Sequence, residues 1–159
     1  MARSCCRKLI AFWLILPERS GASGATPLCA NKFYGEKNLK TVLIVEDTEL
    51  NIDLLTQLLE DDYNLLIARD GAQGVATAEQ NNPDLILMDI SLPILDGYEA
   101  TRRLRSNPAF QSLPIIGLSA HAMNGDAARA KEAGCNEYLT KPVDEDLLLK
   151  KLKEYLKDE

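Results

Sequence analysis

Three acidic residues stand directly after short apolar segments, where their carboxylates could act together. Asp89 follows the unbroken apolar run of residues 85–88. Glu46 and Asp47 follow residues 41–45, a run rich in β-branched side chains. Short apolar runs bounded by turn residues are typical of strands buried on both faces of a parallel sheet. Because open α/β sheets bind ligands at the carboxyl ends of their strands, the sequence predicts three carboxylates at one edge of a sheet.

Two further polar residues end strand-like segments in the second half of the chain. Ser119 closes the segment at residues 114–119, and Lys141 follows residues 137–140. In a parallel sheet both would meet the three acids at the same edge. Carboxylates gathered at low dielectric repel one another strongly unless a cation or a proton intervenes. Oxygen ligands without His or Cys favour a hard cation, so we expect Mg²⁺.

The chemistry that this set of groups supports is phosphoryl transfer. A metal ion, the ammonium of Lys141 and the hydroxyl of Ser119 would surround the oxygens of a phosphoryl group. Asp89, the central acid, would be the nucleophile and would form an acyl phosphate. A single acid after an apolar run is more often a helix N-cap or a loop residue, so the hypothesis depends on the convergence of all these side chains.

The elements that must position these residues alternate along the chain from Lys40 onward. Strands are expected at residues 41–45, 63–68, 85–89, 114–119 and 137–140, and helices at 50–59, 71–81, 98–105, 125–133 and from Asp144 onward. We expect Asn124 to cap the fourth helix and Gly134 to end it. This alternation predicts right-handed crossovers and an α/β fold with a five-stranded parallel sheet and helices on both faces.

Composition narrows the classes of partner. The 159 residues carry 24 acids and 18 bases, a formal net charge of −6. This balance argues against a nucleic-acid partner, which requires a basic face. No apolar run approaches the length of a membrane span, so we expect no membrane partner. The four cysteines form no Cys-x-x-Cys pair, which argues against a zinc site and favours free thiols in a reducing compartment.

The first 38 residues differ from the rest of the chain. Basic residues precede the apolar run at residues 9–16, and a segment rich in Gly, Ser and Ala follows. This outline resembles a secretory signal, which conflicts with a cytoplasmic, Mg²⁺-dependent function. We therefore interpret residues 1–38 as a disordered leader or a mis-assigned N-terminal extension, and residues 39–159 as the folded domain, after which no output domain is expected.

The residues around the predicted site resemble the receiver domain of two-component response regulators, the CheY-like family. The matching pairs are Glu46-Asp47, Met88-Asp89, Leu92-Pro93, Asp96-Gly97, Ser119-Ala120 and Lys141-Pro142. Any one pair occurs widely by chance, but all of them in order at the expected strand ends form a specific pattern. The resemblance covers residues 40–157 and implies a stand-alone, single-domain response regulator.

The resemblance implies a role for each acidic residue. Asp89 would accept a phosphoryl group from a phosphohistidine. Asp47, Asp89 and the backbone carbonyl of Ser91 would ligate Mg²⁺, while Glu46 would hold the ion through water. The domain would thus be a signalling module that catalyses its own phosphorylation and dephosphorylation, rather than an enzyme acting on another substrate.

The resemblance also implies how phosphorylation would be sensed. Lys141 would contact the phosphoryl oxygens, and Ser119 would move to donate a hydrogen bond to one of them. Tyr138 matches the switch aromatic that turns inward as Ser119 moves. The Lys141-Pro142 peptide bond is expected to be cis. The partners would be a sensor histidine kinase or phosphotransfer protein in the cytoplasm, and then an effector bound by the fourth helix, fifth strand and fifth helix.

Three other readings of the chain remain open or disfavoured. It could be a receiver cut from a hybrid kinase or a larger regulator. An Asp-nucleophile phosphatase would need a second Asp where Ser91 stands. A flavodoxin would bind its phosphate after the first strand, where Glu46 and Asp47 would repel it.

Several single residues have simpler expected roles. His121, the only histidine, is interpreted as a surface or helix-start residue rather than a phosphorelay group. Gly97 is expected to supply a turn with positive φ. Arg102, Arg103 and Arg105 are expected to form a solvated helix face.

Overall fold

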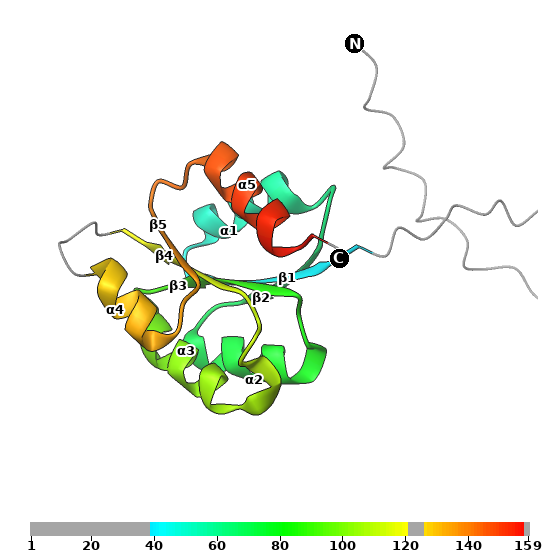
Figure 1. Cartoon of the computed structure of the whole chain (residues 1–159). Helices are drawn as coiled ribbons and strands as arrows, with labels where there is room; N and C mark the ends of the chain where they lie inside the picture. The colour runs from blue at the N-terminus through cyan, green and yellow to red at the C-terminus, as the bar shows by residue number, and fades with distance from the viewer. Residues whose placement is uncertain (1–38, 121–125, 158–159) are drawn as a thin grey trace, which may run out of the picture. The chain divides into compact units, whose positions relative to one another are not determined.

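The computed structural model describes residues 39–120 and 126–157, in which five parallel strands form one sheet (Figure 1). The strand order is β2-β1-β3-β4-β5. The strands are β1 (Thr41–Val45), β2 (Asn64–Ala68), β3 (Leu85–Asp89), β4 (Ile115–Ser119) and β5 (Glu137–Thr140). The predicted five-stranded parallel sheet is confirmed.

The helices follow the strands in the predicted order. They are α1 (Glu49–Leu59), α2 (Gly71–Asn81), α3 (Gly97–Ser106), α4 (Asp126–Ala133) and α5 (Glu145–Tyr155), with a short 3₁₀ helix η1 (Pro108–Phe110) that the sequence analysis did not predict. In Figure 1, α1 and α5 cover one face of the sheet, and α2, α3 and α4 cover the other. The expected helices on both faces are confirmed.

Alternation along the strands divides the buried side chains into two clusters. Val42 and Ile44 of β1 pack with residues of α1 and α5, whereas Leu43 and Val45 pack on the opposite face. The same division holds along β3, whose five residues are all buried. An apolar strand covered on both faces explains why the sequence shows unbroken apolar runs rather than alternation.

The register of the strands aligns the carboxyl ends of β1, β3 and β4. Val45 pairs with Met88, so the next residues along the two strands, Glu46 and Asp89, lie side by side. Asp89 in turn is level with Leu118, one residue before Ser119. The sheet therefore delivers the predicted site residues to a common edge.

Aspartate side chains begin three of the five long helices. Asp70, Asp96 and Asp144 each accept a hydrogen bond from a backbone N–H in the first turn of α2, α3 and α5. Such caps satisfy donors that the helix itself leaves unpaired. Gly134, with φ of 106°, follows α4 as predicted, whereas the expected cap Asn124 and His121 lie outside the described residues.

The expectation of a positive φ at Gly97 is wrong. Gly97 is the first residue of α3, and a Cβ added there would lie 2.2 Å from the carbonyl oxygen of Asp89. Close backbone approach, rather than turn conformation, thus requires glycine at this position. The positive φ in this loop belongs to Ile94, at 66°.

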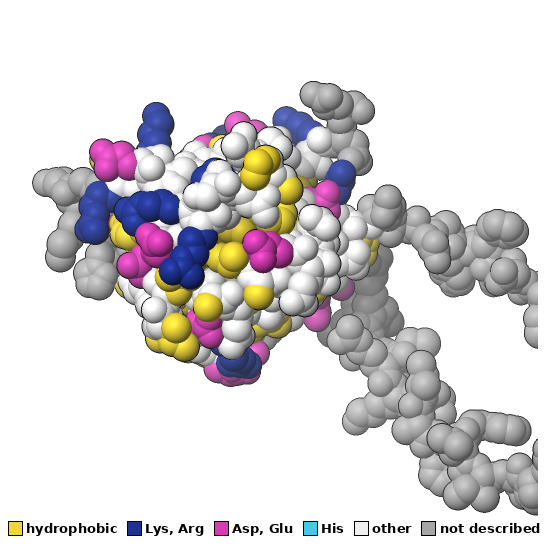
Figure 2. Space-filling view, turned by 90° about the horizontal axis from the view of Figure 1, so that it is seen from below, with side chains coloured by type: hydrophobic (Ala, Val, Ile, Leu, Met, Phe, Trp, Pro, Cys, Tyr) yellow, Lys and Arg dark blue, Asp and Glu magenta, His cyan; other side chains and the backbone are white. Residues whose placement is uncertain are grey.

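The expectation of a solvated arginine face holds for two residues of the three. Arg102 and Arg103 are exposed and lie within 3.2 and 3.5 Å of Glu99. Arg105 instead is half-buried, and its guanidinium donates to Gly134 O, Phe110 O and Asn136 Oδ1. It therefore joins α3 to η1 and to the segment that precedes β5. Figure 2 shows basic and acidic side chains beside one another on the face seen from below.

The predictions about Cys5, Cys6, Cys29 and the leader concern residues 1–38, which lie outside the described residues. Cys135 is described, and it is a free, buried thiol. Within residues 39–120 and 126–157, no helix has the length and apolar character needed to cross a bilayer.

Candidate phosphoryl-transfer site

The three predicted acids converge at the carboxyl edge of the sheet. Glu46, Asp47 and Asp89 each offer a carboxylate oxygen, and these oxygens lie within 4.8 Å of one another. Glu46 is 0% exposed and Asp89 is 3% exposed, whereas Asp47 is open to solvent. The site is therefore a buried pair of acids with one exposed acid beside it.

Lys141 supplies the counter-charge to the buried pair. Its Nζ lies 2.6 Å from Glu46 Oε2 and 2.7 Å from Asp89 Oδ2. Burial lowers the pKa of the Lys141 ammonium, but the hydrogen bonds and charges of Asp89 and Glu46 outweigh it, so the net pKa lies above the usual value. Lys141 is thus held as a cation between the two carboxylates.

The loop after β3 fixes the other oxygen of Asp89. The backbone N–H of Ser91 donates to Asp89 Oδ1 over 2.9 Å. The same loop returns so that Gly97 N donates to Ile90 O over 3.1 Å. Since Gly97 also packs directly on the carbonyl of Asp89, helix α3 and the acid are tied together through backbone atoms.

The two predicted switch residues lie on neighbouring strands. Ser119 is the last residue of β4 and is 3% exposed. Its carbonyl accepts a hydrogen bond of 2.7 Å from the backbone N–H of Lys141. Tyr138 of β5 is half-buried, and its ring packs over Gly117 of β4. The Lys141-Pro142 peptide bond is cis, as predicted.

Sequence reasoning missed one residue that contacts the acids. Asn51, in the first turn of α1, donates from Nδ2 to Glu46 Oε1 over 2.9 Å. Its position five residues after Glu46 has no periodic signature, because it depends on how the chain turns from β1 into α1. The sequence offered one indication of this contact: Asn51 is a polar residue in the first turn of the helix that follows Glu46 and Asp47.

The donor set fits a small divalent cation. All the ligand groups that converge are oxygens, and three carboxylates face one lysine in the described cluster. When the acids are ionised, an excess of negative charge remains that a divalent ion would offset. Magnesium binds through one or two carboxylates and keeps several waters, which suits a site with one exposed acid.

The sequence profile of the response regulator receiver domain matches residues 42–153. The chain belongs to this family. Among curated relatives, the receiver domain is 39% identical to the polar-differentiation response regulator DivK of Brucella ovis over 120 residues, which are 75% of this chain and 98% of DivK. Receiver domains are signalling modules of two-component systems, so the fold and the broad function are those expected from the resemblance.

Solved structures give the same family. The receiver domain of sensor histidine kinase PA1611 from Pseudomonas aeruginosa PAO1 is 38% identical with a TM-score of 0.69, over 74% of this chain and 97% of that one. That structure holds a magnesium ion in its active-site cleft. The chemotaxis regulator CheY4 of Vibrio cholerae is 27% identical with a TM-score of 0.70, over 74% of this chain and 99% of that one.

Proposed function

We propose that this receiver domain accepts a phosphoryl group on Asp89 from a phosphohistidine of a sensor histidine kinase or a phosphotransfer protein. The observation that carries the proposal is the placement of Asp89. Its carboxylate is buried, lies 2.7 Å from the ammonium of Lys141, and stands beside two further acids. A phosphoryl group on that carboxylate would have a fixed positive charge within reach of its oxygens.

In the proposed reaction, a carboxylate oxygen of Asp89 attacks the phosphorus atom. The bond between phosphorus and the histidine nitrogen breaks as the new P–O bond forms, and the imidazole leaves with the electron pair. Lys141 stabilises the negative charge on the phosphoryl oxygens. Hydrolysis then reverses the modification, since water attacks phosphorus and releases inorganic phosphate together with the free Asp89 carboxylate.

The acids beside Asp89 are proposed to hold Mg²⁺. Asp47, Asp89 and the backbone carbonyl of Ser91 would ligate the ion directly, and Glu46 would hold it through water. When bound, the ion supplies positive charge that offsets the phosphoryl oxygens. Support comes from the oxygen-only donor set and from the magnesium ion in the similar receiver of PA1611.

Ser119 and Tyr138 are proposed to report the modification. Ser119 would donate a hydrogen bond to a phosphoryl oxygen, and Tyr138 would turn inward as Ser119 moves. Because an acyl phosphate adds up to about two negative charges, it is able to shift a two-state surface. The surface proposed to bind the effector is formed by α4, β5 and α5.

The setting is proposed to be the cytoplasm, with residues 39–159 as the receiver and residues 1–38 as a leader or a mis-assigned extension. A stand-alone regulator is favoured by the match to 98% of the length of DivK. A receiver within a hybrid kinase is the second candidate, because the receiver of PA1611 is similar to the same degree. Mass spectrometry of the protein isolated from its own cells would give the native ends and decide between them.

Incubation with Mg²⁺ and phosphoramidate, followed by intact-mass measurement, tests the proposal. Phosphoramidate carries a P–N bond like that of phosphohistidine. We expect wild-type protein to gain one phosphoryl group, and Asp89→Asn to gain none. If wild-type protein with a native circular dichroism spectrum gains none either, or if Asp89→Asn gains as much, the proposal is wrong.

A further inference from the structure

We propose that Asn51 is a positioning residue for Glu46 and thereby sets the affinity of the receiver for Mg²⁺. The inference rests on the proposed function, because it assigns Glu46 to the metal site. Asn51 itself is not a metal ligand in this account. It acts through the carboxylate that its side chain orients.

The two oxygens of Glu46 have different partners. Oε2 lies 2.6 Å from Lys141 Nζ. Oε1 accepts from Asn51 Nδ2 over 2.9 Å and, more weakly, from the backbone N–H of Thr48 over 3.4 Å. Asn51 is therefore the close partner that opposes the attraction of Lys141 and holds the carboxylate in one orientation.

The contact with Glu46 needs a hydrogen-bond donor. An ionised carboxylate only accepts hydrogen bonds, so the side chain facing it must present an N–H or O–H group. Glu46 is 0% exposed, so water does not readily replace a lost donor, and a buried carboxylate with an unsatisfied oxygen is costly. A second lysine would add a positive charge and oppose metal binding, whereas the neutral amide of Asn51 does not.

A rigid element carries the amide to its place. Asn51 N donates to Thr48 O over 3.0 Å in the first turn of α1. The next residue, Ile52, and Leu55 are each 3% exposed and anchor the helix against the sheet. The position of Nδ2 is therefore set by packing of α1, and not by an exposed loop.

Removing the donor should weaken metal binding without removing a ligand. Glu46 would keep Lys141 as its one close partner and would turn toward it, away from the position that serves the ion. Loss of a group that orients a metal-binding side chain typically reduces affinity about 10- to 100-fold. We expect the dissociation constant for Mg²⁺ to rise about tenfold in Asn51→Leu.

Calorimetric titration of the full chain with Mg²⁺ tests this expectation. Asn51→Leu keeps the approximate shape of the side chain without its donors, and Asn51→Gln keeps the amide and should recover part of the affinity. Gln57→Leu, an exposed position on the same helix, is the matched control and should bind Mg²⁺ as wild type does. If Asn51→Leu lacks a native circular dichroism spectrum, Asn51→Ala replaces it, because alanine favours the helix.

A second readout separates positioning from general damage. The Mg²⁺ concentration that gives half-maximal phosphorylation by phosphoramidate should rise about tenfold in the folded donor-less variant. The rate at saturating Mg²⁺ should stay within about twofold of wild type, since Asp89 and Lys141 are intact. A merely structural role would lower the saturating rate or the melting temperature and leave the Mg²⁺ dependence unchanged.

The outcomes distinguish this inference from the proposed function. If the folded variant binds Mg²⁺ as tightly as wild type, or if Gln57→Leu loses as much affinity, the role of Asn51 is overturned while Asp89 phosphorylation in wild type stands. If wild-type protein neither binds Mg²⁺ nor is phosphorylated, both fail together.

Discussion

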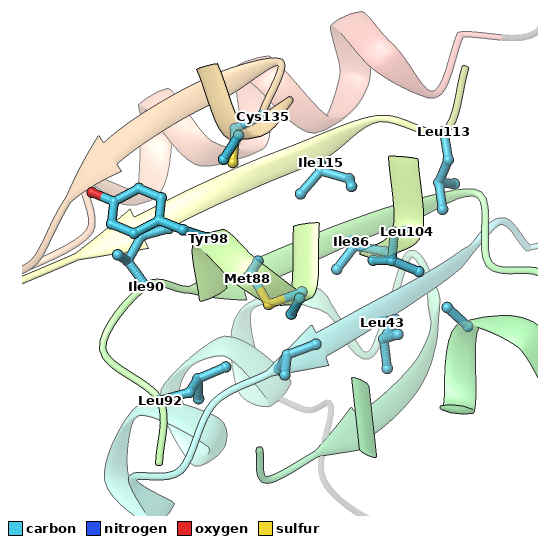
Figure 3. Packing of buried hydrophobic residues seen from close by; sticks show 14 of the residues in the cluster. Leu43, Ile86, Met88, Ile90, Leu92, Tyr98, Leu104, Leu113, Ile115 and Cys135 are labelled. Atoms are coloured by element: carbon cyan, nitrogen blue, oxygen red, sulfur yellow. The ribbon is translucent and has the colours of Figure 1, made fainter. Parts of the chain in front are cut away.

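The two faces of the sheet are packed by different kinds of residue. Among the described residues, every buried member of the cluster on the α1 and α5 face is Val, Ile or Leu. The cluster on the α2, α3 and α4 face mixes Tyr98, Phe110, Cys135 and Met88 with five alanines. Figure 3 shows side chains of this second cluster, including Tyr98 and Cys135.

The faces differ also in how closely backbones approach. Glycines of α2 and α3 pack against neighbouring segments on the second face only. A Cβ on Gly71 would lie 2.2 Å from Leu95 O, one on Gly74 would lie 2.9 Å from Val45 Cγ1, and one on Gly97 would strike Asp89 O. The α1 and α5 face, the first face, thus stabilises the fold mainly through buried aliphatic side chains. The α2, α3 and α4 face, the second face, also fixes the loop that follows Asp89.

The largest loss of stability is expected at Gly97, the glycine that packs against Asp89 of the candidate site. In Gly97→Ala the added methyl group would lie 2.2 Å from Asp89 O and 2.8 Å from Ile90 Cα. Backbone atoms cannot yield as a flexible side chain does, so we expect a loss of about 4 kcal/mol in the free energy of unfolding, above the usual range for overpacking. Urea denaturation measures the loss.

Gly117→Ala provides the control for that prediction. A Cβ on Gly117 would lie 3.3 Å or more from the nearest atoms, which are side-chain atoms of Ile90, Cys135 and Tyr138. We expect a change below about 1 kcal/mol there. Equal losses in the two variants would contradict the account of close backbone packing.

On the aliphatic face, Leu148→Ala should cost stability without touching the site. Leu148 is 0% exposed, and truncating a buried leucine costs about 3 kcal/mol through lost burial and a cavity. Among the described residues, the buried apolar side chains of the loop after β3, Ile90, Leu92 and Leu95, belong to the other cluster. The phosphorylation rate of folded Leu148→Ala should therefore match wild type. A phosphorylation rate well below that of wild type in folded Leu148→Ala would show that the two faces do not divide their roles.

A smaller effect, an increase in stability, is expected from a substitution at Ile94 in the loop between β3 and α3. Ile94 has φ of 66° and is 88% exposed, so a β-branched residue adopts an unfavourable backbone conformation and gains no burial. Ile94→Asn should raise the free energy of unfolding by about 1 kcal/mol, because Asn tolerates positive φ. Chemical denaturation checks the sign, and a loss of stability would show that Ile94 makes a contact in the folded state.

The last effect concerns the pH dependence of stability and the buried thiol of Cys135 on the second face. Burial raises the pKa of Cys135, and the opposing influences of the Thr101 hydroxyl and the Arg105 charge are weaker. Above about pH 8.5 the unfolded thiol loses its proton, whereas the folded thiol, whose pKa is higher, loses its proton only at higher pH. Stability should therefore fall as pH rises past that value, by at most about 1.4 kcal/mol per pH unit.

Comparison of wild type with Cys135→Ala isolates this contribution. Denaturation in a reducing buffer at pH 7.5 and pH 9.5 should show a larger loss for wild type. An equal loss in both proteins would mean that the thiol does not contribute to the pH dependence.

The strands, and the convergence of the candidate site residues at one edge of the sheet, were predictable from sequence because they carry local signals. Unbroken apolar runs mark β1 and β3, and the acids, Ser119 and Lys141 stand at the ends of such runs. A parallel sheet then brings those ends together by topology alone. Pairing of β1 with β3 places Glu46 beside Asp89. The sequence indicates this arrangement because each acid directly follows the apolar run of its strand.

The features that escaped prediction depend on three-dimensional contacts between side chains and backbone that no periodic pattern of residue types encodes. The glycine requirement at Gly97 comes from the carbonyl of Asp89, and the burial of Arg105 comes from three acceptors on other segments. Positive φ at Ile94 runs against the preference of its side chain, so no residue-type rule indicates it. The contact of Asn51 with Glu46 likewise depends on the path from β1 into α1.

The most direct test of the central claim is to locate the phosphoryl group. Borohydride reduces an acyl phosphate to the alcohol, so phosphorylated Asp89 becomes homoserine, whereas phosphoserine and phosphohistidine do not. After treatment with Mg²⁺ and phosphoramidate and then borohydride, peptide mass spectrometry should find homoserine at position 89. Phosphoryl transfer to another residue, with Asp89 unreduced, would contradict the account.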